Sequence, residues 1–342
     1  MHKKLRVLFI CKQRPACYGE SYGLLNSCRF LCNALNDMGV EARTVEVKDN
    51  NEIDRVVTAF RPTHAFIEAL WVVPEKFEVL IPLHPKVKWY VRLHSNVPFI
   101  AQEGMAMDWI KRYLELQWNH GANFALSCNS KRMVNDIGRT LGNSLYPVYA
   151  PNIYQPKCDL ADPPTKPECS SIDIGCFGAI RPLKDQLIQA MAAMCFADDL
   201  EKTMRFHVNT ARIEAHGEGV YRNLKALFQG SRHQLVTHGW LLHPAFLILV
   251  SSMDLGMQVS FSETFDIVAA DFVHVNVPVI GSTEIEWLDK GYQANTTNMN
   301  DIVDKLRHAW DGRKHNHHKS NKKGLEKWND EAREEWEELL DI

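Results

Sequence analysis

The chain has 342 residues, of which 45% are hydrophobic and 24% charged, and its formal net charge is −3. This length suits two domains of ordinary size, and the composition argues against a disordered or fibrous chain. The small net charge excludes a global electrostatic attraction to nucleic acid or an anionic membrane, although it permits a local basic patch.

The nine cysteines are scattered, odd in number and contain no CxxC pair. This favours reduced, buried thiols over a disulfide framework or a structural zinc site, so we expect a cytoplasmic protein, in a host cytoplasm if the chain is viral. The opening "MHKKLRVLFIC" has too short an apolar run for a signal peptide and predicts a first strand. No stretch approaches the roughly 18 apolar residues that a membrane span needs.

Short apolar, β-branched runs alternate with helical patterns along the first half of the chain. Helical stretches include 21–38 and a region around 107–118. This alternation predicts a parallel sheet covered by helices on both faces. The predicted strands are 5–11, 41–47, 64–70, 88–95 and 123–129.

A proline-rich stretch at 149–171 has the composition of an irregular connector, and a second strand–helix series follows it. The predicted strands of this series are 172–180, 205–209, 234–240, 254–260 and 277–282, with a buried helix at 243–253. We therefore predict an N-terminal domain at 1–150, a linker at 151–171, a C-terminal domain at 172–310, and a helical tail at 311–342 that packs back on the N-terminal domain.

The predicted fold class is α/β, with two Rossmann-like, doubly wound domains that face each other across a cleft. Open α/β sheets bind ligands beyond the carboxyl ends of their strands, so candidate site residues should directly follow strands. Gly19 lies in such a loop, "RPACYGESYGLLNS" (14–27), ahead of a helix whose first amides can attract an anion. A plain strand–helix turn explains the loop equally well. It lacks the GxGxxG spacing, which disfavours a nicotinamide enzyme.

Two further loops carry candidate residues. His94 follows an apolar strand in "WYVRLHSNVPF" and is a candidate to bind a sugar hydroxyl or carry a proton, while a purely structural histidine is the alternative. In "GCFGAIRPLKDQLIQA", Gly178, Arg181 and Lys184 link a strand end to a helix. Cations are unfavourable at a helix start unless an anion joins them, so this turn favours a diphosphate ligand over a simple exposed turn.

The stretch "FSETFDIVAAD" carries Glu263 and Asp271, eight positions apart, in a largely apolar setting. Glu263 is expected in the loop before a helix and Asp271 in its second or third turn. One ligand lying along the helix start can touch both, with its phosphate at the helix, Asp271 at its ribose and Glu263 at its sugar.

"FSETFDIVAADFVHVNVPVIGS" resembles the E-x7-E signature of retaining glycosyltransferases of the GT-B fold, of the family-four and glycogen-synthase-like kind. Glu263 matches the first acid, Phe265 the aromatic residue, and Asp271 the second acid. The sequence departs from the pattern at three positions, where Asp266 replaces Gly, Asp271 replaces Glu, and Asn276 replaces Gly.

Other segments are similar to the same family in the same order. "GAIRPLKDQLIQA" places Lys184 on the family's diphosphate lysine, whereas Ala179 holds the arginine position and Arg181 would have to substitute for it. Gly239 and Trp240 fall where the family places the nucleobase. His94 falls where it places a sugar-contacting histidine. The first half of the chain also resembles, without a defined motif, glycosyltransferases that bacteriophages carry.

The resemblance implies metal-independent transfer of a sugar from a nucleoside diphosphate sugar, expected to be a UDP-sugar, to an acceptor hydroxyl, with retention through a same-face displacement. No other cofactor is expected, and no metal is implied. The acceptor is open among DNA, where it would be a hydroxymethylated pyrimidine, saccharide, lipid and protein. The implied catalytic residues are His94, Lys184 and Glu263, and the implied donor-binding residues are Gly19, Gly178, Arg181, Lys184, Gly239, Trp240, Glu263, Phe265, Asp266, Ile267 and Asp271.

Two alternatives use the same fold. The first is a nucleotide-sugar-binding protein that has lost catalysis, motivated by Ala179 and the shortened acid Asp271. The second is a sugar-nucleotide epimerase. A basic segment at 312–328 could contact the phosphates of DNA or lipid, although a solvated segment ahead of an acidic helix explains it better.

Overall fold

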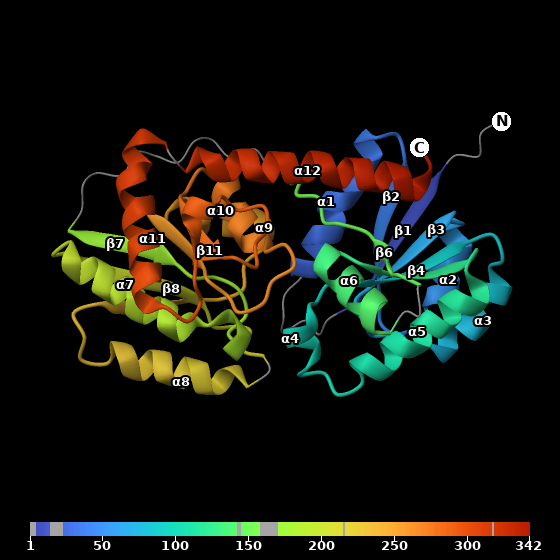
Figure 1. Ribbon diagram of the computed structural model, residues 1–342, viewed down its shortest axis with the longest axis horizontal. Helices are drawn as coiled ribbons and strands as arrows, with labels where there is room; N and C mark the ends of the chain where they lie inside the picture. The colour runs from blue at the N-terminus through green and yellow to red at the C-terminus, as the bar shows by residue number, and fades with distance from the viewer. Residues whose placement is uncertain (1–4, 14–22, 142–144, 158–169, 215, 317) are drawn as a thin grey trace. The chain divides into compact units, whose positions relative to one another are not determined.

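The computed structural model describes residues 5–13, 23–141, 145–157, 170–214, 216–316 and 318–342 (Figure 1). These residues form two units. Unit 1 holds the described residues up to 157 together with 329–342, and unit 2 holds those from 170 to 328. Each unit contains one six-stranded sheet in which every pairing is parallel. The predicted fold class, two doubly wound α/β domains, is confirmed.

The sheet of unit 1 has the strand order β2-β1-β3-β4-β5-β6. Its central strands are buried on both faces, which explains why they are apolar runs without polar alternation. The elements are β1 (Arg6–Lys12), α1 (Gly23–Asp37), β2 (Glu41–Val47), α2 (Ile53–Phe60), β3 (His64–Glu68), α3 (Glu75–Leu83), β4 (Lys88–Leu93), α4 (Val97–Ile100), α5 (Ala106–His120), β5 (Phe124–Cys128), α6 (Lys131–Thr140) and β6 (Val148–Tyr149).

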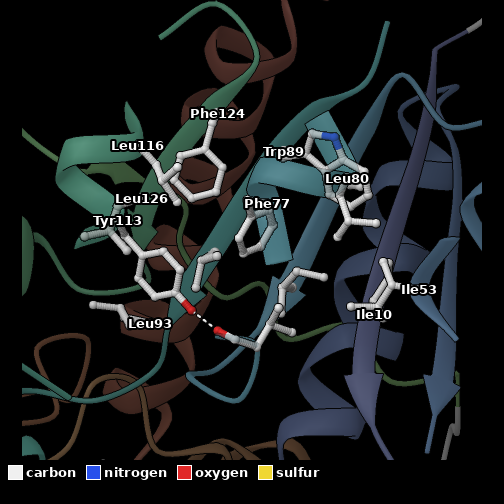
Figure 2. Close-up of a cluster of buried hydrophobic side chains, with 14 of the residues drawn as sticks. Ile10, Ile53, Phe77, Leu80, Trp89, Leu93, Tyr113, Leu116, Phe124 and Leu126 are labelled. Carbon is white, nitrogen blue, oxygen red and sulfur yellow. Dashed lines mark hydrogen bonds between the residues drawn. The ribbon is translucent and has the colours of Figure 1, made fainter. Parts of the chain in front are cut away.

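One apolar cluster of unit 1 joins β4 and β5 to helices α3 and α5 (Figure 2). Phe77 is central to it and lies edge-on to Trp89, Tyr113 and Phe124. The hydroxyl of Tyr113, which the ring carries into this core, donates to the backbone carbonyl of Val72. A buried phenol therefore keeps a hydrogen-bond partner, as burial requires.

The C-terminal helix α12 (Lys319–Leu340) supplies part of this unit's core. Trp336 is fully buried and lies edge-on to Phe9 and Phe66, with ring centroids 5.9 and 5.2 Å away. Its indole N–H donates to the carbonyl of Pro151 at 2.9 Å. The residues of α12 from 329 onward thus belong with unit 1, whereas those up to 328 belong with unit 2.

The sheet of unit 2 has the order β12-β11-β10-β7-β8-β9, and α7 and α8 lie beside β8 and β9 (Figure 1). The chain starts at the centre with β7, builds outward through β8 and β9, and returns to the other side of β7 with β10. Its elements are β7 (Ser171–Gly175), η2 (Pro182–Lys184), α7 (Gln186–Asp199), β8 (Thr203–Asn209), α8 (Gly217–Phe228), β9 (Gln234–His238), α9 (His243–Ser251), β10 (Leu255–Gln258), α10 (Ile267–His274), β11 (Val279–Ser282), η3 (Lys290–Tyr292), β12 (Gln293–Ala294), α11 (Met299–Gly312) and η4 (Arg313–His315).

Helix α9 and the cysteines can be compared with what the sequence predicted. Helix α9 was predicted as buried, and it buries Leu247 and Val250, but Ile248 is 60% exposed. Of the six cysteines that the structure describes, five are buried, Cys195 is exposed, and all six are free thiols. Within the described residues, no helix combines the length and the apolar character that crossing a bilayer requires.

The burial of His64, the first residue of β3, predicts that the folded protein loses stability as the pH falls. It is 5% exposed, and burial, with a smaller contribution from Lys88, lowers its pKa from 6.5 to about 4. The unfolded chain therefore binds the proton first as the pH falls, so stability present above pH 6.5 should be lost down to about pH 4. The upper limit of this loss is about 3 kcal/mol.

The change that isolates this contribution is His64→Asn. Asparagine does not titrate, and its amide can keep the 2.9 Å hydrogen bond to the Thr63 hydroxyl. Urea unfolding at pH 7 and pH 4.5 measures the effect. The variant should lose less stability than wild type between the two pH values, and equal losses would contradict the assignment to His64.

Candidate functional site

Polar side chains of unit 2 gather at the point where its strand order reverses. The carboxyl ends of β7 and β10 lie side by side there, because these two strands pair directly. The loop after β7 leads to Lys184 and the loop after β10 leads to Glu263 and Asp266. In open α/β sheets this switch point is the usual place for a ligand.

Lys184 is the centre of this arrangement, with only 11% of its side chain exposed. Its ammonium nitrogen lies 2.6 Å from Oε1 of Glu263, 3.1 Å from Oδ2 of Asp266 and 3.4 Å from Oε1 of Gln258. The ammonium donates hydrogen bonds to Asp266 and Gln258 and forms an ion pair with Glu263. The structure thus brings together three of the residues that the sequence assigned to the donor, and adds Gln258.

Packing holds the two loops against each other. The amide of Gln189, in α7, donates to the carbonyl of Lys184 at 2.7 Å, and its oxygen accepts from the backbone N–H of Val259 at 2.9 Å. The backbone N–H of Phe261 donates to the carbonyl of Leu183 at 2.9 Å. Gln189 is fully buried, so it fastens the lysine loop to the acidic loop inside the domain.

The charges in this cluster shift one another's protonation. Burial disfavours the ammonium of Lys184, but the attraction of Asp266 and Glu263 outweighs burial and raises its pKa above the ordinary value. Burial raises the pKa of the Asp266 carboxyl, against the attraction of Lys184. The cluster is therefore a buried lysine whose charge is balanced by two acids.

Two departures from the family pattern are explained by backbone conformation. Asp266 has a φ of 59° and Asn276 a φ of 60°, both in the left-handed region. These are two positions at which the pattern has glycine, and aspartate and asparagine are the other residues that adopt this region most readily. Asp266 also caps α10, since its carboxylate accepts from the backbone N–H of Ala269 at 2.9 Å.

Glycine lets α10 lie close to the sheet. A Cβ added to Gly256, in β10, would stand 2.7 Å from the ring of Phe272 in α10. Helix α10 therefore packs this closely on β10 only because residue 256 has no side chain. Gly178, in the loop after β7, has a φ of 112°, and a Cβ there would lie 3.8 Å from Cε of Lys184. Its backbone consequently sits directly beside the lysine.

Polar residues that the sequence analysis did not identify link this site to Arg181, Gly239 and Trp240. Asn209, the last residue of β8, accepts from the backbone N–H of Gly178 at 3.1 Å and donates to the carbonyl of Gly239 at 3.3 Å. The feature of the sequence that could have identified Asn209 is its position at the end of a predicted strand.

Two arginines lie near the same strand ends. The guanidinium of Arg212 lies 5.5 Å from the ring centre of Trp240. Glu214 accepts from Arg212 at 2.5 Å and lies 3.8 Å from Arg181. The positive charge of Arg181 is near enough to Lys184 to lower the pKa of that lysine, against the attraction of the two acids. Whether Arg181 takes over the role of the pattern's arginine, whose position Ala179 holds, stays a prediction.

Asp271 and Phe265 have other partners. Asp271 is 2% exposed in α10, and its Oδ1 lies 2.8 Å from Nε2 of His243 at the start of α9. Phe265 is buried against Trp287 and Trp328, and its carbonyl accepts from the indole N–H of Trp287 at 2.7 Å. Ile267 is the first residue of α10. The carboxylate of Asp271 therefore contacts His243, and its role as a ribose ligand stays a prediction.

In unit 1, His94 directly follows β4 and has 14% of its side chain exposed. Its Nε2 lies 2.5 Å from Oε2 of Glu68, the last residue of β3. Arg92, which is fully buried, donates to the same carboxylate oxygen at 3.1 Å. Sequence reasoning named His94 but missed Glu68, although an acid ending an apolar strand was visible. Gly19 lies outside the described residues.

No protein-family model matches the sequence, and no curated protein is significantly similar to it. Solved structures do resemble the chain. A mutant of S. aureus TarM, in complex with Fondaparinux, alpha-GlcNAc-glycerol and UDP, is 12% identical with a TM-score of 0.58; the match covers 81% of this chain, which spans 55% of that one.

Two other structures match over almost their whole length. Sucrose-phosphate synthase from Thermosynechococcus elongatus is 11% identical, with a TM-score of 0.66 and coverage of 96% of this chain and 97% of that one. The catalytic domain of starch synthase IV from Arabidopsis thaliana, bound to ADP and acarbose, is 10% identical, with a TM-score of 0.65 and coverage of 99% of both chains. At these identities the likeness shows that the chain shares the α/β fold of these glycosyltransferases.

Proposed function

We propose that this protein is a glycosyltransferase that moves a sugar from a nucleoside diphosphate sugar to an acceptor hydroxyl, with retention of configuration. The observation that carries the proposal is the buried Lys184, held between Glu263 and Asp266 at the switch point of the sheet in unit 2. Support also comes from the shared fold with proteins solved in complex with UDP or ADP.

The diphosphate of the donor takes the place of Glu263 at Lys184. The ammonium, the nearby Arg181, the backbone at Gly178 and the first amides of α10 then share its negative charge. Because Lys184 is buried, its charge acts in a medium of low polarity and is worth more than the same charge in water.

Release from Lys184 frees Glu263 to accept hydrogen bonds from sugar hydroxyls. The acceptor oxygen then attacks the anomeric carbon from the face that the phosphate leaves. The bond from that carbon to the phosphate oxygen breaks as the bond to the acceptor forms. The departing phosphate oxygen takes the proton of the acceptor, so no metal ion is required to stabilise the leaving group.

The remaining site residues follow from the same donor. Gly239 and Trp240 bind the base, which is uracil. Asp271 accepts hydrogen bonds from the hydroxyls of the ribose. A hydroxymethylated pyrimidine in DNA is the first acceptor to test, followed by saccharides, in keeping with the bacteriophage resemblance of the sequence.

The test begins with thermal unfolding against a panel of UDP-, ADP- and GDP-sugars. A ligand present at 100 times its dissociation constant should stabilise the folded protein by about 2.7 kcal/mol. The stabilising donor is then incubated with hydroxymethylated DNA or saccharides, with and without EDTA. We expect the same rate of transfer in both, and the same anomeric configuration in donor and product.

Other outcomes point to the alternative functions. Stabilisation without hydrolysis or transfer would favour a silent binding protein, and an isomerised sugar nucleotide without acceptor would favour an epimerase. A rate abolished by EDTA and restored by Mg²⁺ would contradict metal independence. Absence of stabilisation by every sugar nucleotide would contradict the donor itself.

A further inference from the structure

Glu68 is a buried carboxylate to which the proposed chemistry gives no role. It ends β3, beside β1 where the strand order of unit 1 reverses, and none of its surface is exposed. Burying an ionised carboxylate is costly unless charged partners compensate it. Its Oε2 contacts Arg92 and the candidate catalytic residue His94.

Arg92 holds this carboxylate in place. Its Nε donates to the carbonyl of Ala150 at 2.8 Å, and one terminal nitrogen donates to the carbonyl of Pro151 at 2.9 Å and to Oδ1 of Asn152 at 2.5 Å. The other terminal nitrogen donates to Glu68 at 3.1 Å. With every nitrogen engaged, the guanidinium cannot turn, so the carboxylate keeps one orientation.

That orientation determines where His94 carries its proton. An ionised carboxylate only accepts hydrogen bonds, so the proton in the 2.5 Å contact belongs to Nε2 of His94. A terminal nitrogen of Arg92 lies 3.5 Å from the same Nε2, and in this tautomer that long contact joins two donors and is not a hydrogen bond. A neutral imidazole then has an unprotonated Nδ1. Nδ2 of Asn129 lies 3.4 Å from this Nδ1, which suits a nitrogen that accepts.

The charges around the ring agree with a neutral histidine next to an ionised acid. Burial lowers the pKa of His94, and the nearby Arg92 lowers it further, against the attraction of Glu68. Burial opposes ionisation of Glu68, but Arg92 and His94 outweigh it and lower its pKa. Other titratable groups facing this cluster are the thiols of Cys11, Cys28, Cys32 and Cys128, and burial raises the pKa of the last three.

We propose that Glu68 is a positioning residue that holds His94 in the Nε2–H tautomer, so that Nδ1 accepts a hydrogen bond from a hydroxyl of the bound sugar. The hydroxyl replaces the long contact to Asn129. The second half of this inference rests on the proposed glycosyltransferase function, whereas the first half concerns the protein alone. A purely structural ion pair between Glu68 and Arg92 would leave the histidine tautomer without consequence.

The decisive variant is Glu68→Gln, which has the same shape as wild type. Arg92 requires an acceptor, so the amide oxygen of the glutamine turns to Arg92 and its NH2 group faces His94. An NH2 group donates, so Nε2 of His94 must now accept and the proton moves to Nδ1. The variant therefore exchanges the two tautomers and makes Nδ1 a donor.

Nitrogen-15 NMR of histidine-labelled protein reads the tautomer directly. The His94 signals are identified by their absence from a His94→Gln variant. We expect a protonated Nε2 in wild type and a protonated Nδ1 in Glu68→Gln. A protonated Nδ1 in wild type, or the same tautomer in both proteins, would overturn the proposal, and the wild-type spectrum decides even if the variant does not fold.

Transfer kinetics test the consequence. Glu68→Gln should lower kcat about 10- to 100-fold, because a hydroxyl in the site loses its acceptor, while UDP affinity stays within twofold of wild type. Donors lacking one sugar hydroxyl at a time should include one for which wild type and variant react at equal rates. The matched control is Glu75→Gln, which changes an exposed acid paired with Arg112 in the same unit and should retain wild-type kcat.

The outcomes separate this inference from the proposed function. An exchanged tautomer with unchanged kcat would overturn the role of Glu68 while leaving the glycosyltransferase intact. Equal losses in kcat for every deoxy donor would assign Glu68 a structural role and overturn the hydroxyl contact. Wild type that transfers no sugar from any donor would overturn the proposed function, and with it the hydroxyl contact, while the NMR spectrum still judges the tautomer.

Discussion

Lys184→Ala is expected to lower the rate of sugar transfer at saturating donor by about 10²- to 10³-fold or more. This is the typical effect of deleting one preorganised donor from the place where charge develops in a transition state. In this protein the deleted group is a buried cation, and the developing charge is that of the departing diphosphate. Initial rates at saturating donor and calorimetric titration with UDP measure the two contributions, turnover and affinity.

The same substitution should also change the pH dependence of stability. Without Lys184, the carboxylates of Glu263 and Asp266 remain at the same buried position with no cation between them. One of them is then more stable when protonated, so the melting temperature should fall more at pH 8 than at pH 5. The matched control is Lys225→Ala, an exposed lysine of unit 2 above the ring of Tyr221. Turnover of the Lys184 variant at the control's rate would rule out the proposed role.

Arg92→Met is expected to lower the free energy of unfolding of unit 1 by about 3–5 kcal/mol, the usual cost of removing one partner from a buried ion pair. Methionine fills a similar length but donates no hydrogen bond. It removes the donor that Arg92 supplies to the carboxylate of Glu68, the carbonyls of Ala150 and Pro151, and the side chain of Asn152. Urea unfolding followed by tryptophan fluorescence measures the loss.

The control for this prediction is Arg112→Met. Arg112 also pairs with a glutamate, Glu75, but at the surface, where water replaces the lost partner. Its unfolding midpoint should stay at the wild-type value. If the midpoints of the two variants agree, the buried network around Arg92 is not what stabilises this part of unit 1.

Hydrophobic patterning predicted the strands well because buried parallel strands are nearly continuous apolar runs. All ten predicted strands are present, at positions such as Glu41–Val47 and Gln234–His238. Among the described residues, the two strands that it missed, Val148–Tyr149 and Gln293–Ala294, contain two residues each. A strand that short carries no period, and it forms only because an existing sheet edge offers hydrogen bonds, so it has no local signal.

The family pattern was informative about backbone as much as about chemistry. Asp266 and Asn276 looked like departures because they replace glycines, yet both adopt the left-handed conformation for which glycine is normally selected. The shortened acid Asp271 is different, because the side chain of His243 occupies its carboxylate. Nothing near residue 271 in the sequence pointed to that histidine, which comes from a different helix.

The sequence by itself determined the alternation of strands and helices, the parallel sheets, and the strand-end loops in which Lys184, Glu263 and His94 lie, since these depend on periodicity and local turn chemistry. Only the tertiary structure decided which of these polar groups meet. Lys184 finds two acids some 80 residues away, and His94 finds Glu68 on the neighbouring strand, because strand order brings distant carboxyl ends to one edge. Pairing of buried charges depends on distances of a few ångströms, and no local pattern encodes those.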